Sequence, residues 1–127
     1  MHKIAFAPAA VLLLHILATA MGWYTALWWL DTPMHFLGGA AIAASSYYFL
    51  EDFSRRQKFH AQFKPLQILI LIALTALAAV AWEFFEYALD ATVRTAMQAS
   101  VNDTMKDMAM GLLGAILAAG AIVLRKE

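Results

Sequence analysis

Acidic residues recur at helical spacing in three separate parts of the chain, and one of these parts adds a histidine. The three groups are Asp31 with His35, Glu83 with Glu86 and Asp90, and Asp103 with Asp107. Residues three, four or seven apart share one face of a helix. Carboxylates and imidazoles on facing helices form the metal sites of helix bundles. We therefore expect a divalent metal ion, Zn, Mn, Fe or Mg, at this cluster.

The residue types also predict roles for individual side chains. The expected metal ligands are His35, Glu83, Asp107, Asp31 and Asp90. A carboxylate that is free of the metal, Glu86 or Asp103, would act as a general base, and Arg94 and Lys106 would bind a substrate phosphate. This set predicts a metal-dependent hydrolase that acts on a lipid-like or phosphorylated substrate. The chain has no nucleophile motif and no H-E-x-x-H pattern that would specify the reaction further.

Other interpretations fit the same residues. The cluster could bind cations or protons in a transport protein, although the helices offer almost no polar path beyond it. It could also be a structural lock of hydrogen-bonded acids. Asp31 and Asp103 could cap the helices that they begin, and Asp90 could be a solvated residue at a helix end. His15, in the middle of the first apolar segment, could be a packing histidine with its hydrogen bonds satisfied.

These polar residues lie in a very apolar chain. Of the 127 residues, 63% are hydrophobic and 14% are charged, against about 45–50% and about 25% in soluble domains. This composition excludes a disordered chain, a nucleic-acid-binding protein and an ordinary soluble domain. The chain has no cysteine, which excludes disulfides and thiolate metal sites.

Four apolar segments must position the acidic residues. We predict helices over 4–29, 33–50, 66–90 and 104–124, with a loop over 51–65, in a single membrane domain over 1–127. Each segment approaches the roughly 20 residues that cross a bilayer, where only helices or closed barrels satisfy the backbone. The expected fold class is an all-α integral membrane four-helix bundle. The first segment continues beyond a sequence that resembles a signal-peptide cleavage site, so we expect it to be retained.

The basic residues predict the orientation of this bundle. Of the nine Lys and Arg residues, only Arg94 and Lys106 fall at the acidic end. The others lie at the opposite end: Lys3, Arg55, Arg56, Lys58, Lys64, Arg125 and Lys126. The positive-inside rule then places both termini and the loop in the cytoplasm, with the acids at the outer face. The expected partners are the lipid bilayer and, because glycine-rich faces favour helix packing, a homo-oligomer, but no nucleic acid.

Three motifs in order along the chain carry a resemblance to known proteins. They are DTPMHFLGG over 31–39, WEFFEY over 82–87 with Asp90, and DTMKD over 103–107 with Gly114. With these motifs the chain resembles the YjdF-type bacterial inner membrane proteins and, more distantly, the VanZ-like proteins associated with glycopeptide resistance. The resemblance covers about 31–118 and implies a small multi-pass protein of the bacterial inner (plasma) membrane, with polar residues at a shared site. Gly111 stands where the VanZ-like pattern has an asparagine.

Overall fold

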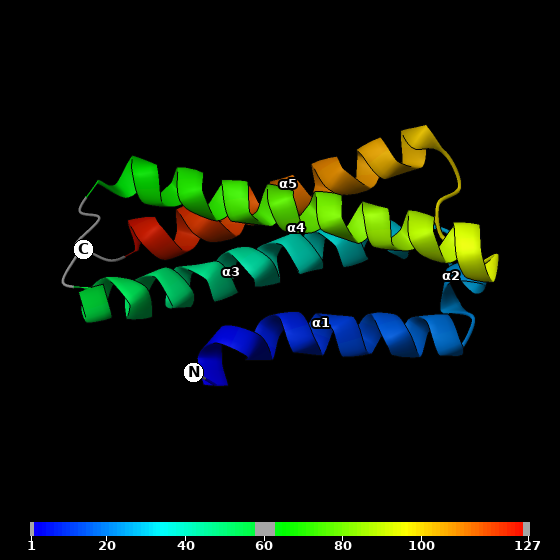
Figure 1. Ribbon diagram of the computed structural model, residues 1–127, viewed down its shortest axis with the longest axis horizontal. Helices are drawn as coiled ribbons and strands as arrows, with labels where there is room; N and C mark the ends of the chain where they lie inside the picture. Colours follow the sequence, from blue (N-terminus) through cyan, green and yellow to red (C-terminus); the bar gives the residue numbers. More distant parts are fainter. Residues whose placement is uncertain (1, 58–62, 126–127) are drawn as a thin grey trace.

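The computed structural model describes residues 2–57 and 63–125, and in these ranges the chain is helical with no strand (Figure 1). The helices are α1 (His2–Ala20), α2 (Trp23–Ala26), α3 (Asp31–Gln57), α4 (Lys64–Val93) and α5 (Val101–Leu124). The predicted all-α fold is therefore confirmed. The count differs from the predicted four helices because α2 is a separate short helix.

The first helix is shorter than the predicted segment over 4–29. It ends at Ala20, and Gly22 then adopts a positive φ of 69°. This left-handed conformation is favoured only by glycine, and it turns the chain out of α1 into α2. Apolar composition marks this segment but does not reveal the turn inside it.

The next helices are longer than predicted at both ends. α3 begins at Asp31 and continues to Gln57, so the described part of the predicted loop over 51–65 is largely helical. Pairs four residues apart support this last part of α3: Arg55 lies 3.4 Å from Glu51 and Arg56 lies 2.9 Å from Asp52. Residues 58–62, which include Lys58, lie outside the described residues, as does Lys126.

The last two helices have sequence features that mark where they begin. α4 begins at Lys64 with a proline in its first turn, a position where the missing N–H costs nothing. α5 begins three residues earlier than predicted because Ser100 caps it: the Ser100 hydroxyl accepts a hydrogen bond of 3.1 Å from the Asp103 N–H.

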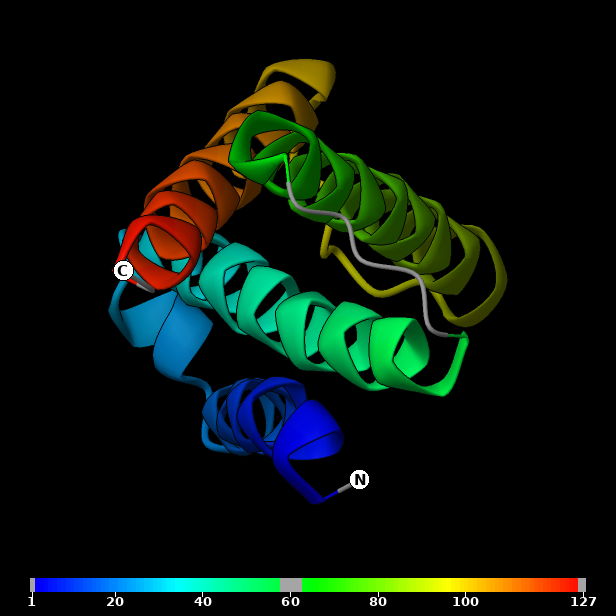
Figure 2. The same ribbon diagram turned by 90° about the vertical axis from the view of Figure 1, so that its left-hand side faces the viewer.

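Helix α3 is the central element of the bundle. It packs most extensively against α5 and also contacts α1 and α4, and Figure 2 shows these neighbours arranged around it. The start of α1, the end of α3, the start of α4 and the end of α5 lie toward one end of the bundle, whereas α2 and the connection from α4 to α5 lie at the other (Figure 1). The acidic motifs therefore share one end, as expected. The side of the membrane on which this end lies stays a prediction.

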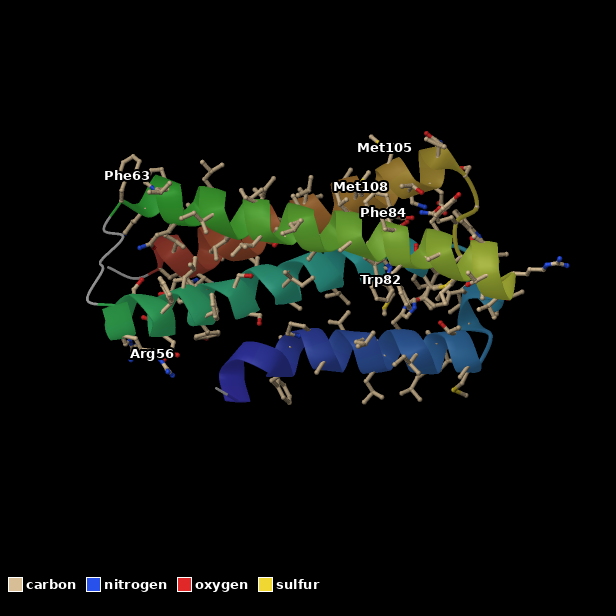
Figure 3. All side chains as sticks on the ribbon, in the orientation of Figure 1. Arg56, Phe63, Trp82, Phe84, Met105 and Met108 are labelled. Carbon is tan, nitrogen blue, oxygen red and sulfur yellow. The ribbon has the colours of Figure 1, made fainter. Side chains whose placement is uncertain are left out.

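Two of the described helices have the length and composition to cross a membrane: α4 and α5. Large apolar side chains such as Phe84 and Met105 point outward from the bundle (Figure 3) and are exposed. An apolar surface of this kind is typical of helices that face lipid. In α1 the apolar stretch Phe6–Ala20 is shorter, and α3 carries more Ser and Tyr than α4 and α5. Four crossings therefore stay a prediction.

Candidate metal centre

His35 of α3 lies at the centre of two groups of potential metal ligands. Ligand atoms of Asp31, His35 and Asp107 lie within 4.8 Å of one another, and so do those of His35, Glu83 and Glu86. Helices α3, α4 and α5 each contribute to this set, which we call the His35 cluster. The structure thus brings together four of the expected metal ligands with one of the two expected bases.

Distances within the His35 cluster are longer than those of ordinary hydrogen bonds. His35 Nε2 lies 3.4 Å from Asp31 Oδ1 and 3.9 Å from Asp107 Oδ2, whereas N–H···O bonds measure about 2.7–3.2 Å. Two ligand atoms on a tetrahedral zinc ion, each at about 2.0–2.1 Å from it, lie about 3.4 Å apart. The spacing is therefore close to that of atoms that share one ion.

Asp107 has a carboxylate oxygen that the protein does not satisfy. Its side chain is only 5% exposed, and its Oδ1 is buried without a hydrogen-bond partner among the described residues. The Lys106 ammonium lies 3.5 Å from this oxygen, beyond a normal hydrogen bond. A buried polar atom without a hydrogen bond costs free energy, and binding of an ion or a water molecule removes that cost.

Glycines explain why Asp107 reaches His35. A Cβ atom added to Gly39 would lie 1.9 Å from the Gly111 carbonyl oxygen, so α3 and α5 approach backbone to backbone at this point. His35 lies one turn before Gly39, and Asp107 lies one turn before Gly111. Since both helices begin at the same end of the bundle (Figure 1), the close contact also brings these two side chains together.

Hydrogen bonds from outside the cluster hold the two glutamates of α4. Trp82 Nε1 donates to Glu86 Oε1 at 2.7 Å, and Gln98 Nε2 donates to Glu83 Oε2 at 3.1 Å and to the Glu83 carbonyl at 3.0 Å. Both glutamates are buried. Such donors orient a carboxylate and leave its other lone pairs for a ligand.

Asp90 is not brought into either group, although its spacing predicted a metal ligand. It lies two turns beyond Glu83, and its carboxylate accepts hydrogen bonds from the Thr95 hydroxyl and from the N–H groups of Met97 and Gln98. Asp90 thereby folds the connection from α4 to α5 back onto α4. The Gln98 backbone is thereby bonded to Asp90, and the Gln98 side chain reaches Glu83.

The other expected site residues lie at the edge of the cluster or away from it. Asp103 is outside both groups and pairs with Lys106, with 2.6 Å between Oδ1 and Nζ. Lys106 borders the cluster through Asp107. Arg94 ends α4 in a left-handed conformation with φ 60°, and its side chain is exposed. The structure therefore brings neither Asp103 nor Arg94 to His35.

His15 of α1 joins the periphery of the cluster. Its Nδ1 lies 2.7 Å from the Tyr24 hydroxyl, and its ring meets Trp82 edge to face with 5.2 Å between centroids. Because Trp82 in turn donates to Glu86, His15 contacts a residue that orients the cluster. Neither Trp82 nor Gln98 is among the site residues that the sequence predicted.

Comparison with known proteins agrees with a membrane location. A family model described as "Predicted membrane protein (DUF2238)" matches residues 2–127. No curated protein and no solved structure matches the chain. The chain belongs to the DUF2238 family of predicted membrane proteins.

Proposed function

We propose that this membrane protein binds a divalent metal ion in the His35 cluster. The single observation that carries the proposal is the buried Asp107 carboxylate: its Oδ1 has no hydrogen bond among the described residues, and its Oδ2 lies 3.9 Å from His35 Nε2. An ion held by His35, Asp31 and Asp107, with Glu83 and Glu86 alongside, would satisfy that oxygen.

The charge of the cluster also favours a cation. Four carboxylates surround His35, and Lys106, the one lysine that the structure places near them, is shared with Asp103. Close carboxylates disfavour one another's ionised forms unless a counter-charge is present. Imidazole with carboxylate oxygens suits Zn, Mn or Fe, and Mg less well.

A lock of hydrogen-bonded acids accounts less well for the geometry. In such a lock the cluster members would bond one another at normal distances, because this is how buried polar groups recover the cost of leaving water. The hydrogen bonds to Glu83 and Glu86 instead come from Gln98 and Trp82, and Asp107 Oδ1 receives none. The two glutamates are thus oriented by donors from outside the cluster.

Hydrolysis of a lipid-like or phosphorylated substrate is a second candidate function. The observation that favours it is a cavity that opens beside His35 and Asp107. A bound divalent ion would supply polarisation of an ester or phosphoryl oxygen. Glu86 is the better candidate for the base, since Asp103 is paired with Lys106. The resemblance to YjdF-type and VanZ-like proteins supports a membrane protein with a shared polar site and names no reaction.

Metal binding can be tested directly on the purified protein. We expect elemental analysis to find one divalent ion per chain, and calorimetric titration of the metal-free protein with Zn or Mn to be saturable. Asp107→Asn and Glu83→Gln should each weaken binding strongly. Asp52→Asn is a matched control, because Asp52 lies in α3 at the opposite end and pairs with Arg56.

Two results would overturn the proposal. One is a wild-type protein that takes up no stoichiometric metal although it is folded. The other is an Asp107→Asn variant that binds metal as tightly as Asp52→Asn. Ion flux through liposomes that contain the protein would move the assignment from a resident metal site to transport.

A further inference from the structure

A cavity of about 150 Å³ lies next to the His35 cluster, lined by residues of α1, α3, α4 and α5. One end of the cavity is polar, with His15, His35, Trp82 and Asp107 in its lining. Figure 3 shows the Trp82 side chain on the side of α4 that faces α1. The polar end of the cavity is therefore continuous with the proposed metal centre.

The rest of the cavity is lined mostly by apolar and small residues. Its lining runs from His35 to Ile42 on α3, from Trp82 to Thr75 on α4 and from His15 to Pro8 on α1. Each stretch is two helical turns, or about 10 Å at 1.5 Å per residue. Small residues line the space between: Gly38, Ala78 and Ala79. The Thr75 hydroxyl is already bonded to the Leu71 carbonyl at 2.9 Å, so the far end offers no free hydrogen-bond donor.

We propose that this cavity binds the alkyl chain of an amphiphile whose anionic, oxygen-bearing head group lies against His15 and the His35 cluster. An apolar channel of this length with one polar end fits a single chain and its head group. The surrounding bilayer would supply such molecules at high local concentration. The preference for an anionic head rests on the proposed metal ion, whereas binding of the chain does not.

His15 is the residue that we assign to the head group. The Tyr24 hydroxyl lies on α2, and burial raises the pKa of this hydroxyl above its ordinary value, so it stays protonated. When it donates to His15 Nδ1, the ring carries its hydrogen on Nε2. No described residue takes a hydrogen bond from Nε2, so it is free to donate to an oxygen of the head group.

Gly38 gives a direct way to fill the cavity. A Cβ atom at Gly38 would meet no atom within 4 Å, and the residue is part of the lining. A leucine at this position would therefore grow into the cavity. Gly120 of α5 is a matched control, because a Cβ there also meets nothing within 4 Å and the residue is not part of the lining.

The test uses Trp82 as a local fluorescent probe. The other three of the four tryptophans, Trp23, Trp28 and Trp29, are replaced by phenylalanine, and the full chain is placed in phosphatidylcholine nanodiscs. Decanoate brominated on its chain is then titrated, because bromine quenches indole fluorescence on contact. We expect saturable quenching that is retained in Gly120→Leu and lost in Gly38→Leu.

The outcomes separate this inference from the proposed metal site. Equal quenching in the two leucine variants, rising in proportion to the ligand in the bilayer, would overturn the cavity as a binding site. If saturable quenching is unchanged when metal is removed with a chelator, the preference for an anionic head is overturned. Metal titration of Gly38→Leu should match that of Gly120→Leu. If no variant binds metal, and the parent protein does not bind it either, this result contradicts the proposed function instead.

Discussion

Gly38 and Gly39 are neighbours on α3, yet they face opposite kinds of space. A Cβ at Gly39 would collide with the backbone of Gly111 at 1.9 Å, whereas a Cβ at Gly38 would meet nothing within 4 Å. Both glycines border the cavity, but Gly39 packs against α5 whereas Gly38 has open space beside it. One residue along a helix is a rotation of about 100°, which is enough to change from a backbone contact with α5 to open space.

The difference teaches how a thin bundle can be both rigid and open. On the tight side, the backbone contact between α3 and α5 fixes the position of Asp107 relative to His35. On the open side, α3 leaves room for a ligand that would approach the same imidazole. We therefore expect substitutions on the two sides to have effects of different size and, in one case, of opposite sign.

The largest effect should come from adding a side chain on the tight side, where α3 and α5 are in backbone contact. Gly39→Ala places a methyl group where the Gly111 carbonyl now lies, so α3 and α5 must separate. Overpacking of this kind costs about 1–3 kcal/mol, occasionally more. We expect this loss in the free energy of unfolding, measured by titration with a denaturing detergent, and weaker metal binding as His35 and Asp107 move apart. Gly120→Ala, on the same pair of helices but in open space, should not lose stability, and an equal loss there would remove the special role of Gly39.

A smaller effect should come from the hydrogen bonds that orient the cluster. Gln98→Ala leaves Glu83 Oε2 without the donor that the structure gives it. Loss of such a supporting contact typically weakens metal binding by about 10- to 100-fold. Calorimetric titration with Zn measures this change.

Asp90→Asn sharpens the interpretation of that result. If Asp90 acts by positioning Gln98, the two substitutions affect the same contact. The metal affinity of the double variant Asp90→Asn/Gln98→Ala should then equal that of whichever single variant has the lower affinity. Losses that add in the double variant would instead make Asp90 an independent contributor, as a metal ligand would be.

The sequence predicted the parts of the site that lie on long helices better than the part that depends on an irregular connection. Helical spacing was enough to expect Asp31, His35, Glu83 and Asp107 in one place. The partners of Asp90 lie in the irregular connection from α4 to α5, where periodicity carries no information. The spacing of Asp90 therefore suggested a ligand, whereas in the structure its carboxylate bonds this connection.

The sequence did not predict the turn at Gly22, for a similar reason. Gly22 adopts a left-handed conformation, whereas Gly38, Gly39 and Gly120 continue their helices. Nothing in the neighbouring apolar residues distinguishes the first glycine from the others. The break matters, since it places Tyr24 on a separate short helix within reach of His15.

A modest effect should come from the hydrogen bond between Tyr24 and His15, a residue that lines the polar end of the cavity. Tyr24→Phe removes the 2.7 Å hydrogen bond to His15 and no apolar surface. A typical hydrogen bond contributes about 0.5–1.5 kcal/mol to stability, and we expect a loss of this size in the denaturing-detergent titration. Tyr87→Phe is the control, because the Tyr87 side chain is exposed on α4. The same loss in both variants would show that the effect is not specific to the link between Tyr24 and His15.

The smallest effect should be a gain on the open side. Gly38→Ala adds a methyl group in open space, and replacing a glycine inside a helix by alanine favours folding by about 0.5–1 kcal/mol. The same methyl group narrows the cavity, so quenching of Trp82 by the brominated decanoate should weaken while stability rises. A packing role for Gly38 predicts the reverse, a loss of stability with no change in quenching. Opposite signs in these two measurements would therefore identify the Gly38 side of α3 as space kept open for a ligand.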